Sequence, residues 1–358
     1  MSTEESFRTI VIGGGQAGLA AGYFLAQQGG DFIILDAGLR TGDAWRNRWD
    51  SLRLFTPSQF NGLPGMPFPK PDYYFPTKDE VADYLEGYAG QFHLPVRHEV
   101  KVEALSKSDV GFRLEAGPTS FSARNVIVAT GPFTMPYTPD FAKDLDPALF
   151  QLHSNAYRNP EQIPVQSMLV VGAGNSGAEI AMELSRAGKK VWLAGRDVGR
   201  IPANTLGKAF GGRPYWWFIS QALSVSTPIG RKMRSNVLYH GNPLIRANRR
   251  EIIESGIECV PRLSGGRGGK PVFEDGRNVD VDGVIWATGF RPYFGWIDLP
   301  VFDEHDLPRH ERGVIPEAKG LYFVGLHFQT ALSSALMGGV GADAKYITGK
   351  IANNGRLN

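Results

Sequence analysis

The stretch Gly13-Gly14-Gly15-Gln16-Ala17-Gly18 decides the fold. An apolar run at 9–12 predicts a strand before it, and small and apolar residues at 17–28 predict a helix after it. A second apolar run at 32–35 predicts another strand. A strand, a glycine-rich turn, a helix and a strand in this order are typical of a dinucleotide-binding βαβ unit.

The residues of this turn have separate physical roles. Gly13 permits a tight turn, Gly15 lets the backbone approach a pyrophosphate, and Gly18 lets the helix pack closely against the strand. The helix starts at about Gln16, so its free N–H groups face the phosphates. Asp36 ends the second strand and is placed to accept hydrogen bonds from a ribose. We therefore expect Gly13, Gly15, Gln16, Gly18 and Asp36 to bind a dinucleotide.

The same pattern returns at Gly172-Ala173-Gly174-Asn175-Ser176-Gly177. A strand is predicted at 168–171, a helix near 176–187 and a second strand at 191–194. We expect Gly172, Gly174, Asn175, Ser176 and Gly177 to bind a second dinucleotide.

The two units differ where the ribose is recognised. Arg196 follows the second strand of the second unit, where the first unit has Asp36. Arginine suits a 2′-phosphate, which favours NADPH over NADH. The adjacent Asp197 would repel a phosphate or accept from a free hydroxyl, so the use of NADH stays open.

Two apolar strands that end in Ala-Thr-Gly form a further internal repeat. They cover 126–131 and 284–289, and each could close one unit. Thr130 and Thr288 stand at the ends of these strands, and we expect both to contact a cofactor.

These repeats predict an α/β fold with two Rossmann-like dinucleotide-binding domains, in which the nicotinamide domain is inserted into the FAD domain. Residues 1–163 and 290–358 then form the FAD-binding domain, and residues 164–289 form the NAD(P)H-binding domain. We call each glycine-rich turn, together with the start of the helix after it, a dinucleotide cradle. The first cradle, Gly13–Gly18, is assigned to FAD because Asp36 follows it and because it comes first in the chain. A nicotinamide and a flavin held in one chain can pass a hydride between them.

Composition limits the partners. The chain has 358 residues, a formal net charge of +2 and a single cysteine, Cys259. The balanced charge gives no reason to expect nucleic-acid binding, and one cysteine excludes an internal disulfide or dithiol relay. No apolar run is long enough for a membrane span, and no His, Cys or acid spacing predicts a metal site. We expect a cytoplasmic protein and leave a homodimer open.

The chain resembles the class B flavin-dependent monooxygenases, which include the flavin-containing monooxygenases and the plant auxin-forming enzymes. The resemblance runs nearly from end to end. It is carried by Gly13–Gly18, Gly42–Arg46, Trp49–Leu54, His153–Arg158, Gly172–Gly177 with Glu179, and Ala287–Pro292.

By this resemblance, Gly42 and Trp45 lie along the FAD, and Leu52 lies near the flavin ring. A helix of small residues after Thr330 is expected to point its N-terminus at the flavin pyrimidine. Gln329 and Thr330 are expected to lie beside the cofactor.

Three residues are the candidate catalytic residues: Phe55, His153 and Tyr157. His153 and Tyr157 belong to the family's His-x-x-x-Tyr signature, which lies in the link between the domains. We expect His153 to position this hinge rather than to transfer protons. Phe55 stands where flavin-containing monooxygenases usually carry an asparagine that hydrogen-bonds near the reactive flavin, and phenylalanine offers no such bond.

The resemblance implies a C4a-peroxyflavin whose lifetime depends on a dry, hydrogen-bonded pocket. The implied reaction inserts one atom of molecular oxygen into a small organic substrate, by sulfoxidation or Baeyer–Villiger oxidation. Two alternatives stay open. One is an NAD(P)H-dependent flavin reductase or oxidase that releases peroxide, and the other is a flavin-bearing regulatory protein without turnover.

The stretch 214–223 is the most aromatic part of the chain, and basic residues follow it at Arg231, Lys232 and Arg234. We expect its rings to cover a substrate channel or to pack against the other domain. An aromatic helix with a basic end could alternatively rest on a membrane surface.

Overall fold

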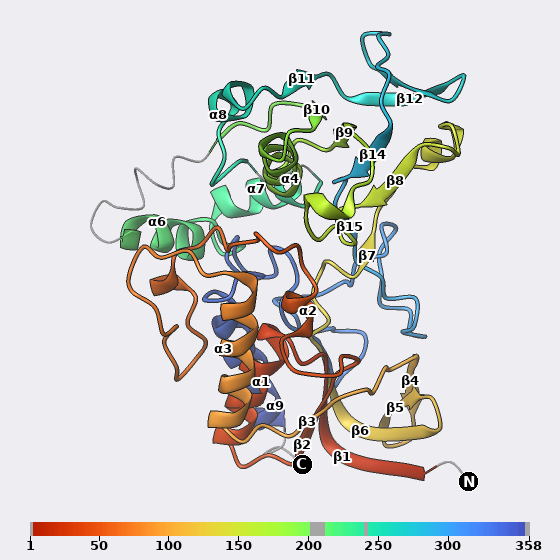
Figure 1. Ribbon diagram of the computed structural model, residues 1–358. Helices are drawn as coiled ribbons and strands as arrows, with labels where there is room; N and C mark the ends of the chain where they lie inside the picture. The colour runs from red at the N-terminus through yellow and green to blue at the C-terminus, as the bar shows by residue number, and fades with distance from the viewer. Residues whose placement is uncertain (1–2, 201–211, 240–242, 355–358) are drawn as a thin grey trace.

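The computed structural model describes residues 3–200, 212–239 and 243–354, which form two units, each built around its own sheet (Figure 1). The first sheet lies in the lower unit of the view, near both chain ends, and the second lies in the upper unit. Among the described residues, no helix combines the length and the apolar character that crossing a membrane requires.

The first sheet is a mainly parallel sheet in the strand order β3-β2-β1-β6-β5-β4, and β16 also pairs with β6. β4 and β5 are antiparallel to their neighbours, whereas the remaining pairs are parallel. Its strands are β1 (Thr3–Ile12), β2 (Phe32–Leu35), β3 (Val96–Arg97), β4 (Ala104–Ser108), β5 (Gly111–Ala116), β6 (Thr119–Val128) and β16 (Leu321–Phe323).

Three helices pack with one face of this sheet in a single hydrophobic cluster: α1 (Gln16–Gln27), α3 (Lys78–Gln91) and α9 (Val340–Asn354). α1 presents small residues to the sheet, and a Cβ on its Gly22 would lie 2.7 Å from Cδ1 of Ile34. α3 begins with a capping box, since the Thr77 hydroxyl accepts from the Glu80 N–H and the Glu80 carboxylate accepts from the Thr77 N–H. A second cluster fills the other face of the sheet.

The second sheet repeats the first. Its order is β11-β10-β9-β14-β8 and every pair is parallel, so β9, β10, β11 and β14 occupy the places of β1, β2, β3 and β6. Its strands are β8 (Phe150–His153), β9 (Ser167–Val171), β10 (Lys190–Ala194), β11 (Glu258–Val260) and β14 (Gly283–Trp286), and α4 (Asn175–Arg186) follows β9. The fully buried strands read as continuous apolar runs, as parallel sheets require.

The predicted fold class is confirmed: two Rossmann-like units are present, and the second is inserted into the first. The chain passes between them at two short strands, β7 (Met135–Pro136) and β15 (Phe290–Arg291), which pair antiparallel. The predicted boundary between residues 163 and 164 falls after β8, which pairs with β14 in the second sheet. We therefore propose that the first crossing lies at β7, and that the return at residue 290 coincides with β15.

The remaining elements connect or cover the two sheets. In the first unit they are α2 (Asp43–Arg46) and η1 (Ser58–Phe60); η2 (Asp140–Asp144) precedes β8, and η3 (Pro160–Gln162) lies between β8 and β9. The second unit adds α6 (Arg213–Trp217), η5 (Phe218–Ala222), α7 (Pro228–Tyr239), α8 (Arg249–Glu254) and the hairpin of β12 (Leu263–Arg267) and β13 (Lys270–Phe273).

The aromatic stretch 214–223 packs against the first unit, as the sequence led us to expect. Ile219, Leu223 and Phe328 form the buried centre of a small cluster that also includes Trp216. The backbone N–H of Val225 donates to the Thr330 carbonyl at 2.8 Å. This insertion from the second unit thus docks on the segment that is predicted to lie beside the flavin.

Candidate active site

The first glycine-rich turn has the geometry of a dinucleotide cradle. Gly13 has a φ of +106°, and its N–H donates to the Leu35 carbonyl at 2.7 Å. A Cβ on Gly18 would lie 1.8 Å from the Gly13 carbonyl oxygen, so only glycine lets α1 start this close to the turn. By contrast, apart from Gly15 itself and its chain neighbours, no described atom lies within 4 Å of the Cβ position of Gly15, which caps α1. Gln16 follows as the first residue of the helix, and this open helix N-terminus suits a pyrophosphate.

Asp36 is held at the edge of this cradle by two backbone amides. Its Oδ2 accepts from the Gly14 N–H at 2.5 Å, and its Oδ1 accepts from the Gly38 N–H at 2.8 Å. Each carboxylate oxygen can accept a further hydrogen bond, so the fixed side chain remains suited to a ribose hydroxyl.

The second turn has the same geometry. Gly172 has a φ of +109°, and a Cβ on Gly177 would lie 1.8 Å from the Gly172 carbonyl oxygen. Gly174 caps α4 with φ −75° and ψ −175°, against −78° and −172° for Gly15. The Cβ position of Gly174 also has no described atom within 4 Å. The chain therefore holds two equivalent open helix N-termini.

The Ala-Thr-Gly repeat is explained by the close approach of a third strand to each turn. A Cβ on Gly13 would lie 2.8 Å from the Ala129 carbonyl oxygen, and one on Gly172 would lie 2.3 Å from the Ala287 carbonyl oxygen. Each repeat thus supports the first glycine of its own cradle.

Two polar side chains of the second cradle differ in what they contact. The Asn175 amide donates to the Pro243 carbonyl at 3.1 Å and accepts from the Ile245 N–H at 2.9 Å, so it holds the segment 243–245 beside α4. Ser176 is exposed. Their predicted contacts with a cofactor stay a prediction.

Arg196 lies at the rim of a small hollow at the carboxyl end of β10. The hollow is also lined by Asp197 and Arg249, the first residue of α8. The Asp197 carboxylate accepts from the Gly199 N–H at 2.9 Å and lies 3.6 Å from the Arg249 guanidinium. Two guanidinium groups and one carboxylate leave the hollow with a net positive charge, which suits a phosphate.

One buried hydroxyl beside the first cradle has no protein partner. Thr130 follows the strand that supports Gly13, and its Oγ1 is buried and makes no hydrogen bond. The Thr330 hydroxyl, by contrast, lies beside the Asp343 carboxylate of α9. Buried polar atoms are nearly always paired, so the Thr130 hydroxyl fits a bound group that supplies the missing partner. The residues of the first cradle therefore fit a flavin nucleotide.

The side chains of Thr288 and Gln329, by contrast, have protein partners. The Thr288 hydroxyl donates to the Tyr137 carbonyl across the crossing strands. The Gln329 amide donates to the Phe323 carbonyl at 2.9 Å and accepts from the Leu326 N–H at 3.2 Å. These contacts favour structural roles for both side chains, and their predicted cofactor contacts stay untested.

Gly42 and Trp45 pack within the first unit, whereas Leu52 lies where the clusters of the two units meet. Gly42 has a φ of +93°, and its Cβ would lie 2.7 Å from the Ala82 carbonyl oxygen of α3, so glycine is required there. Trp45 packs on the cluster of the first unit. Leu52 packs on the clusters of both units, which puts it at their junction, where a flavin ring would meet a nicotinamide.

Phe55 lies three residues after Leu52 with 38% of its surface exposed. The loop that carries it is fixed by the fully buried Asn61, whose amide donates to the Thr56 carbonyl at 2.8 Å. Phe55 therefore lies on an ordered loop but leaves part of its ring open to solvent.

His153 is placed in the link between the units by two backbone contacts. Its Nδ1 accepts from the Asn155 N–H at 3.0 Å, so the proton resides on Nε2, which donates to the Gly289 carbonyl at 3.1 Å. Burial lowers the pKa of His153, and the nearby Arg48 lowers this pKa further. Both ring nitrogens are thus occupied by the protein, which supports a positioning role.

Tyr157 is fully buried in the core of the second unit. Its hydroxyl donates to the Glu183 carboxylate of α4 at 3.0 Å. Burial and the neighbouring carboxylate raise the pKa of Tyr157. This environment favours an anchor for α4 over a group that transfers protons.

The sequence did not draw attention to Arg48, Arg246 or Arg249. Arg48 lies beside the crossing strands, 5.4 Å from the ring centre of Phe290, and burial lowers its pKa. Arg246 joins the units, since it donates to the Arg53 carbonyl at 3.0 Å and lies 3.6 Å from the Glu179 carboxylate. None of the three belongs to a glycine motif, so the sequence gave no signal for them.

The described residues contain no cluster of three or more histidine, cysteine or acidic side chains that could hold a metal ion. Two dinucleotide cradles, with the unpaired Thr130 hydroxyl at the first and with Arg196 and Arg249 lining the hollow at the second, define a flavin- and nicotinamide-dependent oxidoreductase.

Comparisons with known proteins give the family. Residues 10–205 match the family described as pyridine nucleotide-disulphide oxidoreductase. A protein named uncharacterized oxidoreductase CzcO-like, from Geobacillus kaustophilus, is 42% identical over 96% of this chain and 98% of its own length. The probable indole-3-pyruvate monooxygenase YUCCA3 of Arabidopsis thaliana is 29% identical over 96% of this chain and 86% of its own length.

A solved structure is also similar. A flavin-containing monooxygenase from Stenotrophomonas maltophilia matches with a TM-score of 0.78 and 26% identity, over 98% of this chain and 99% of its own. The chain belongs to the pyridine nucleotide-disulphide oxidoreductase family and, within it, to the class B flavin-dependent monooxygenases. It is a flavin-dependent oxidoreductase that uses a nicotinamide nucleotide, and the reading as a flavin-bearing protein without turnover is set aside.

Proposed function

We propose that this protein is an FAD-dependent monooxygenase that takes hydride from NADPH, and less well from NADH, and inserts one oxygen atom into a small organic substrate. Sulfoxidation and Baeyer–Villiger oxidation are the proposed reactions. One observation carries the proposal: two cradles of equal backbone geometry, each with an open glycine at a helix N-terminus, lie in one chain.

The assignment of FAD to the first cradle rests on Asp36 and on the unpaired hydroxyl of Thr130. Two backbone amides orient the Asp36 carboxylate, which would accept from the adenosine ribose. Thr130 would bond to the cofactor with a hydroxyl that otherwise lacks a partner. Thr330 would lie beside the flavin. Gly13, Gly15 and Gly18 would hold the pyrophosphate at the N-terminus of α1.

The preference for NADPH rests on Arg196 and Arg249. Both line the hollow at the end of β10, where the adenosine ribose of a nicotinamide nucleotide would lie. Asp197 lies among them and would weaken the hold on a phosphate, which supports retained use of NADH.

The flavin, when bound and reduced by the nicotinamide, supplies the chemistry that activates oxygen. The side chains of the protein bind the cofactor, orient it and shield it from water. Leu52 lies at the junction of the units and would exclude water from the ring. α9 would direct its N-terminal N–H groups at negative charge on the flavin. His153 and Thr288 hold the crossing strands, which fixes one unit against the other.

The test is anaerobic reduction followed by oxygen. The purified protein is mixed with NADPH or NADH without air, and bleaching of the flavin is followed in a stopped-flow spectrometer. Oxygen is then added with methyl phenyl sulfide or cyclohexanone, and products are identified by mass spectrometry with ¹⁸O₂. We expect bleaching, faster with NADPH, and one labelled oxygen atom in the sulfoxide or the lactone.

A second candidate function is favoured by one observation. Phe55 is 38% exposed and offers no hydrogen bond, so solvent can reach the place where an asparagine would bond near the flavin. An NAD(P)H oxidase that releases peroxide would then be the main activity. Stoichiometric peroxide with no labelled product in the same experiment would establish it.

A further inference from the structure

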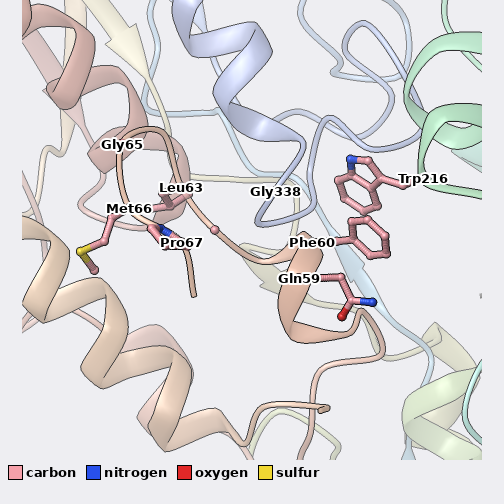
Figure 2. Close-up of a pocket in the computed structure, with 9 residues that line it drawn as sticks. Gln59, Phe60, Leu63, Gly65, Met66, Pro67, Trp216 and Gly338 are labelled. Carbon is pink, nitrogen blue, oxygen red and sulfur yellow. The ribbon is translucent and has the colours of Figure 1, made fainter. Parts of the chain in front are cut away.

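A cavity of about 350 Å³ lies beside the junction of the two units and is not part of either cradle (Figure 2). One side is formed by Gln59 and Phe60, with Trp216 of α6 beside them. The other side is formed by the loop of Leu63, Met66 and Pro67. Its volume lies within the range that is typical of small-molecule sites.

The aromatic wall of this cavity is built from both units. The rings of Phe60 and Trp216 are stacked, with centres 4.9 Å apart and planes within 4° of parallel. Gly338 brings the segment before α9 against this wall, since a Cβ there would lie 2.0 Å from the Phe60 carbonyl oxygen. The wall is therefore a stacked aromatic pair that exists only where segments of the two units meet.

The opposite loop is held in place before any ligand binds. The Tyr84 hydroxyl donates to the Met66 carbonyl at 2.7 Å and accepts from the Leu63 N–H at 2.7 Å. The Tyr88 hydroxyl donates to the Pro64 carbonyl at 2.6 Å. Because this loop is already ordered, binding of a ligand costs little conformational entropy of the protein.

Gln59 supplies one polar contact. Its Oε1 accepts from the Tyr73 N–H at 2.8 Å, whereas its Nε2 is buried and has no partner. Buried donors without partners are rare in folded proteins, and this one belongs to a residue that lines a cavity. An acceptor oxygen on a ligand would satisfy it.

The cavity carries no charge of its own. Its described lining consists of Gln59, Phe60, Gly62, Leu63, Gly65, Met66, Pro67, Trp216 and Gly338, none of which is ionisable. A carboxylate or an ammonium group would lose hydration there without gaining an ion pair. The lining therefore selects against charged ligands.

Its position links the cavity to the proposed flavin site. Gln59 and Phe60 follow the loop of Leu52 and Phe55, and Gly338 lies between Thr330 and α9. Trp216 packs in the same cluster as Phe328 and Leu336. Segments on both sides of the predicted flavin ring thus meet at this cavity.

We propose that this cavity is the organic-substrate site, and that it takes an uncharged, flat, largely apolar molecule carrying an acceptor oxygen, such as an aryl ketone. The ring of the ligand lies against Phe60 and Trp216, and its oxygen accepts from Nε2 of Gln59. The catalytic role of this site rests on the proposed function, whereas the binding of the ligand does not depend on it.

Binding is tested without turnover. The holoenzyme, with oxidised flavin and no nicotinamide, is titrated with 4-fluoroacetophenone, and ¹⁹F line broadening gives the Kd. 4-Fluorobenzoate, which has the same ring with a carboxylate in place of the ketone, is the charged comparison. We expect broadening with the ketone and at least roughly tenfold weaker binding of the benzoate.

Three variants locate the probe. Trp216→Ala removes the aromatic wall and is expected to weaken binding roughly tenfold, whereas Trp216→Phe keeps a ring and retains most of the affinity. Gln59→Leu removes the donor and is expected to weaken ketone binding roughly fivefold. The matched control is Trp217→Ala, because Trp217 is the next residue in α6 and is 61% exposed outside the lining.

Flavin content and the rate of anaerobic flavin reduction by NADPH are measured for each variant, and both are expected to match wild type. Equal ketone affinity in wild type and in a folded Trp216→Ala variant would overturn the inference, as would tighter binding of the benzoate. Ketone binding at this cavity without any oxygenated product would leave the site intact and remove the proposed function. If oxygenation is unaffected by all three variants, the proposed function stands and this cavity is not the substrate site.

Discussion

Nε2 of His153 lies 3.1 Å from the carbonyl oxygen of Gly289, and the same oxygen accepts from the Tyr137 N–H at 3.0 Å. Gly289 directly precedes β15, and Tyr137 directly follows β7, the strand with which β15 pairs. One carbonyl thus ties both crossing strands to the end of β8. We propose that His153 positions the crossing between the two units, although it lies in neither cradle.

Replacing His153 should therefore change how fast hydride crosses between the units. His153→Ala is expected to slow flavin reduction by NADPH roughly tenfold, whereas His153→Gln, which keeps a donor near the position of Nε2, should recover most of the rate. The measurement is stopped-flow reduction as a function of pH. A positioning role leaves the pH profile of the remaining rate unchanged, and loss of a limb of that profile would instead mark His153 as an acid or base.

Tyr157 should matter for stability more than for chemistry. Tyr157→Phe deletes the bond to Glu183 and leaves a half-buried carboxylate with less support, so the free energy of unfolding should fall by about 1–2 kcal/mol. The measurement is urea unfolding of the flavin-loaded protein. Tyr293→Phe is the control, because that ring is 51% exposed, and it should change stability little. A large drop in flavin reduction rate at unchanged stability would contradict the anchoring role.

The two cradles and their inserted order could be predicted because each depends on local sequence. Gly18 and Gly177 each face the turn just before them. The requirement for glycine at these positions can therefore be recognised from the spacing of a few neighbouring residues. The strand order then follows from the repeat. The boundary at 163–164 stays a prediction. The pairing of β8 with β14 lies beyond local sequence, because β14 comes more than a hundred residues later.

The side-chain roles were less predictable for the same reason. The Asn175 amide bonds to backbone groups of the distant segment 243–245, and no motif records this contact. Arg249 reaches the Arg196 hollow from α8, and Trp216 reaches Phe60 from an insertion. Contacts between distant segments decide these roles.

Nicotinamide preference should depend on both arginines of the hollow. Arg196→Ser and Arg249→Ser are each expected to raise the Kd for NADPH roughly tenfold, because each removes a charged hydrogen bond to the 2′-phosphate. The Kd for NADH should change less than about twofold. Asp197→Asn is the opposite test, since it removes a repelling carboxylate and should tighten NADPH binding. Equal losses for both nucleotides would place the arginines elsewhere on the cofactor.

Acid should destabilise the protein through His310. Burial, with Arg234 beside it, lowers the pKa of His310 to about 4, and its Nδ1 already accepts from the Gly313 N–H at 3.1 Å. The unfolded chain binds this proton near pH 6.5, whereas the folded protein resists it, so stability is complete above that pH and falls as pH drops towards about 4. The expected loss is on the order of 3 kcal/mol.

The matched variant is His310→Asn, which keeps an acceptor for Gly313 and removes the titration. Its free energy of unfolding should lose part of the slope between pH 6.5 and about 4 that wild type shows. Parallel curves for the two proteins would show that other groups cause the acid sensitivity.

We expect Phe55 to influence how the electrons of the reduced flavin are used. Its ring is 38% exposed and has no polar atom, so it neither seals the site nor bonds to the cofactor. Phe55→Asn should restore a side chain that can donate and accept, and we expect the share of NADPH electrons recovered as peroxide to fall at least twofold. Peroxide and oxygenated product are measured together against NADPH consumed.

Two controls separate the reasons for such a change. Phe55→Leu keeps an apolar side chain without a polar group, so it should leave the peroxide share near that of wild type. Val110→Asn introduces the same amide at an exposed turn between β4 and β5 and should leave the peroxide share unchanged. If Phe55→Asn and Phe55→Leu lower peroxide equally, ring size rather than hydrogen bonding controls the fate of oxygen. If neither does, the nicotinamide retained in the second cradle is the group that protects the site.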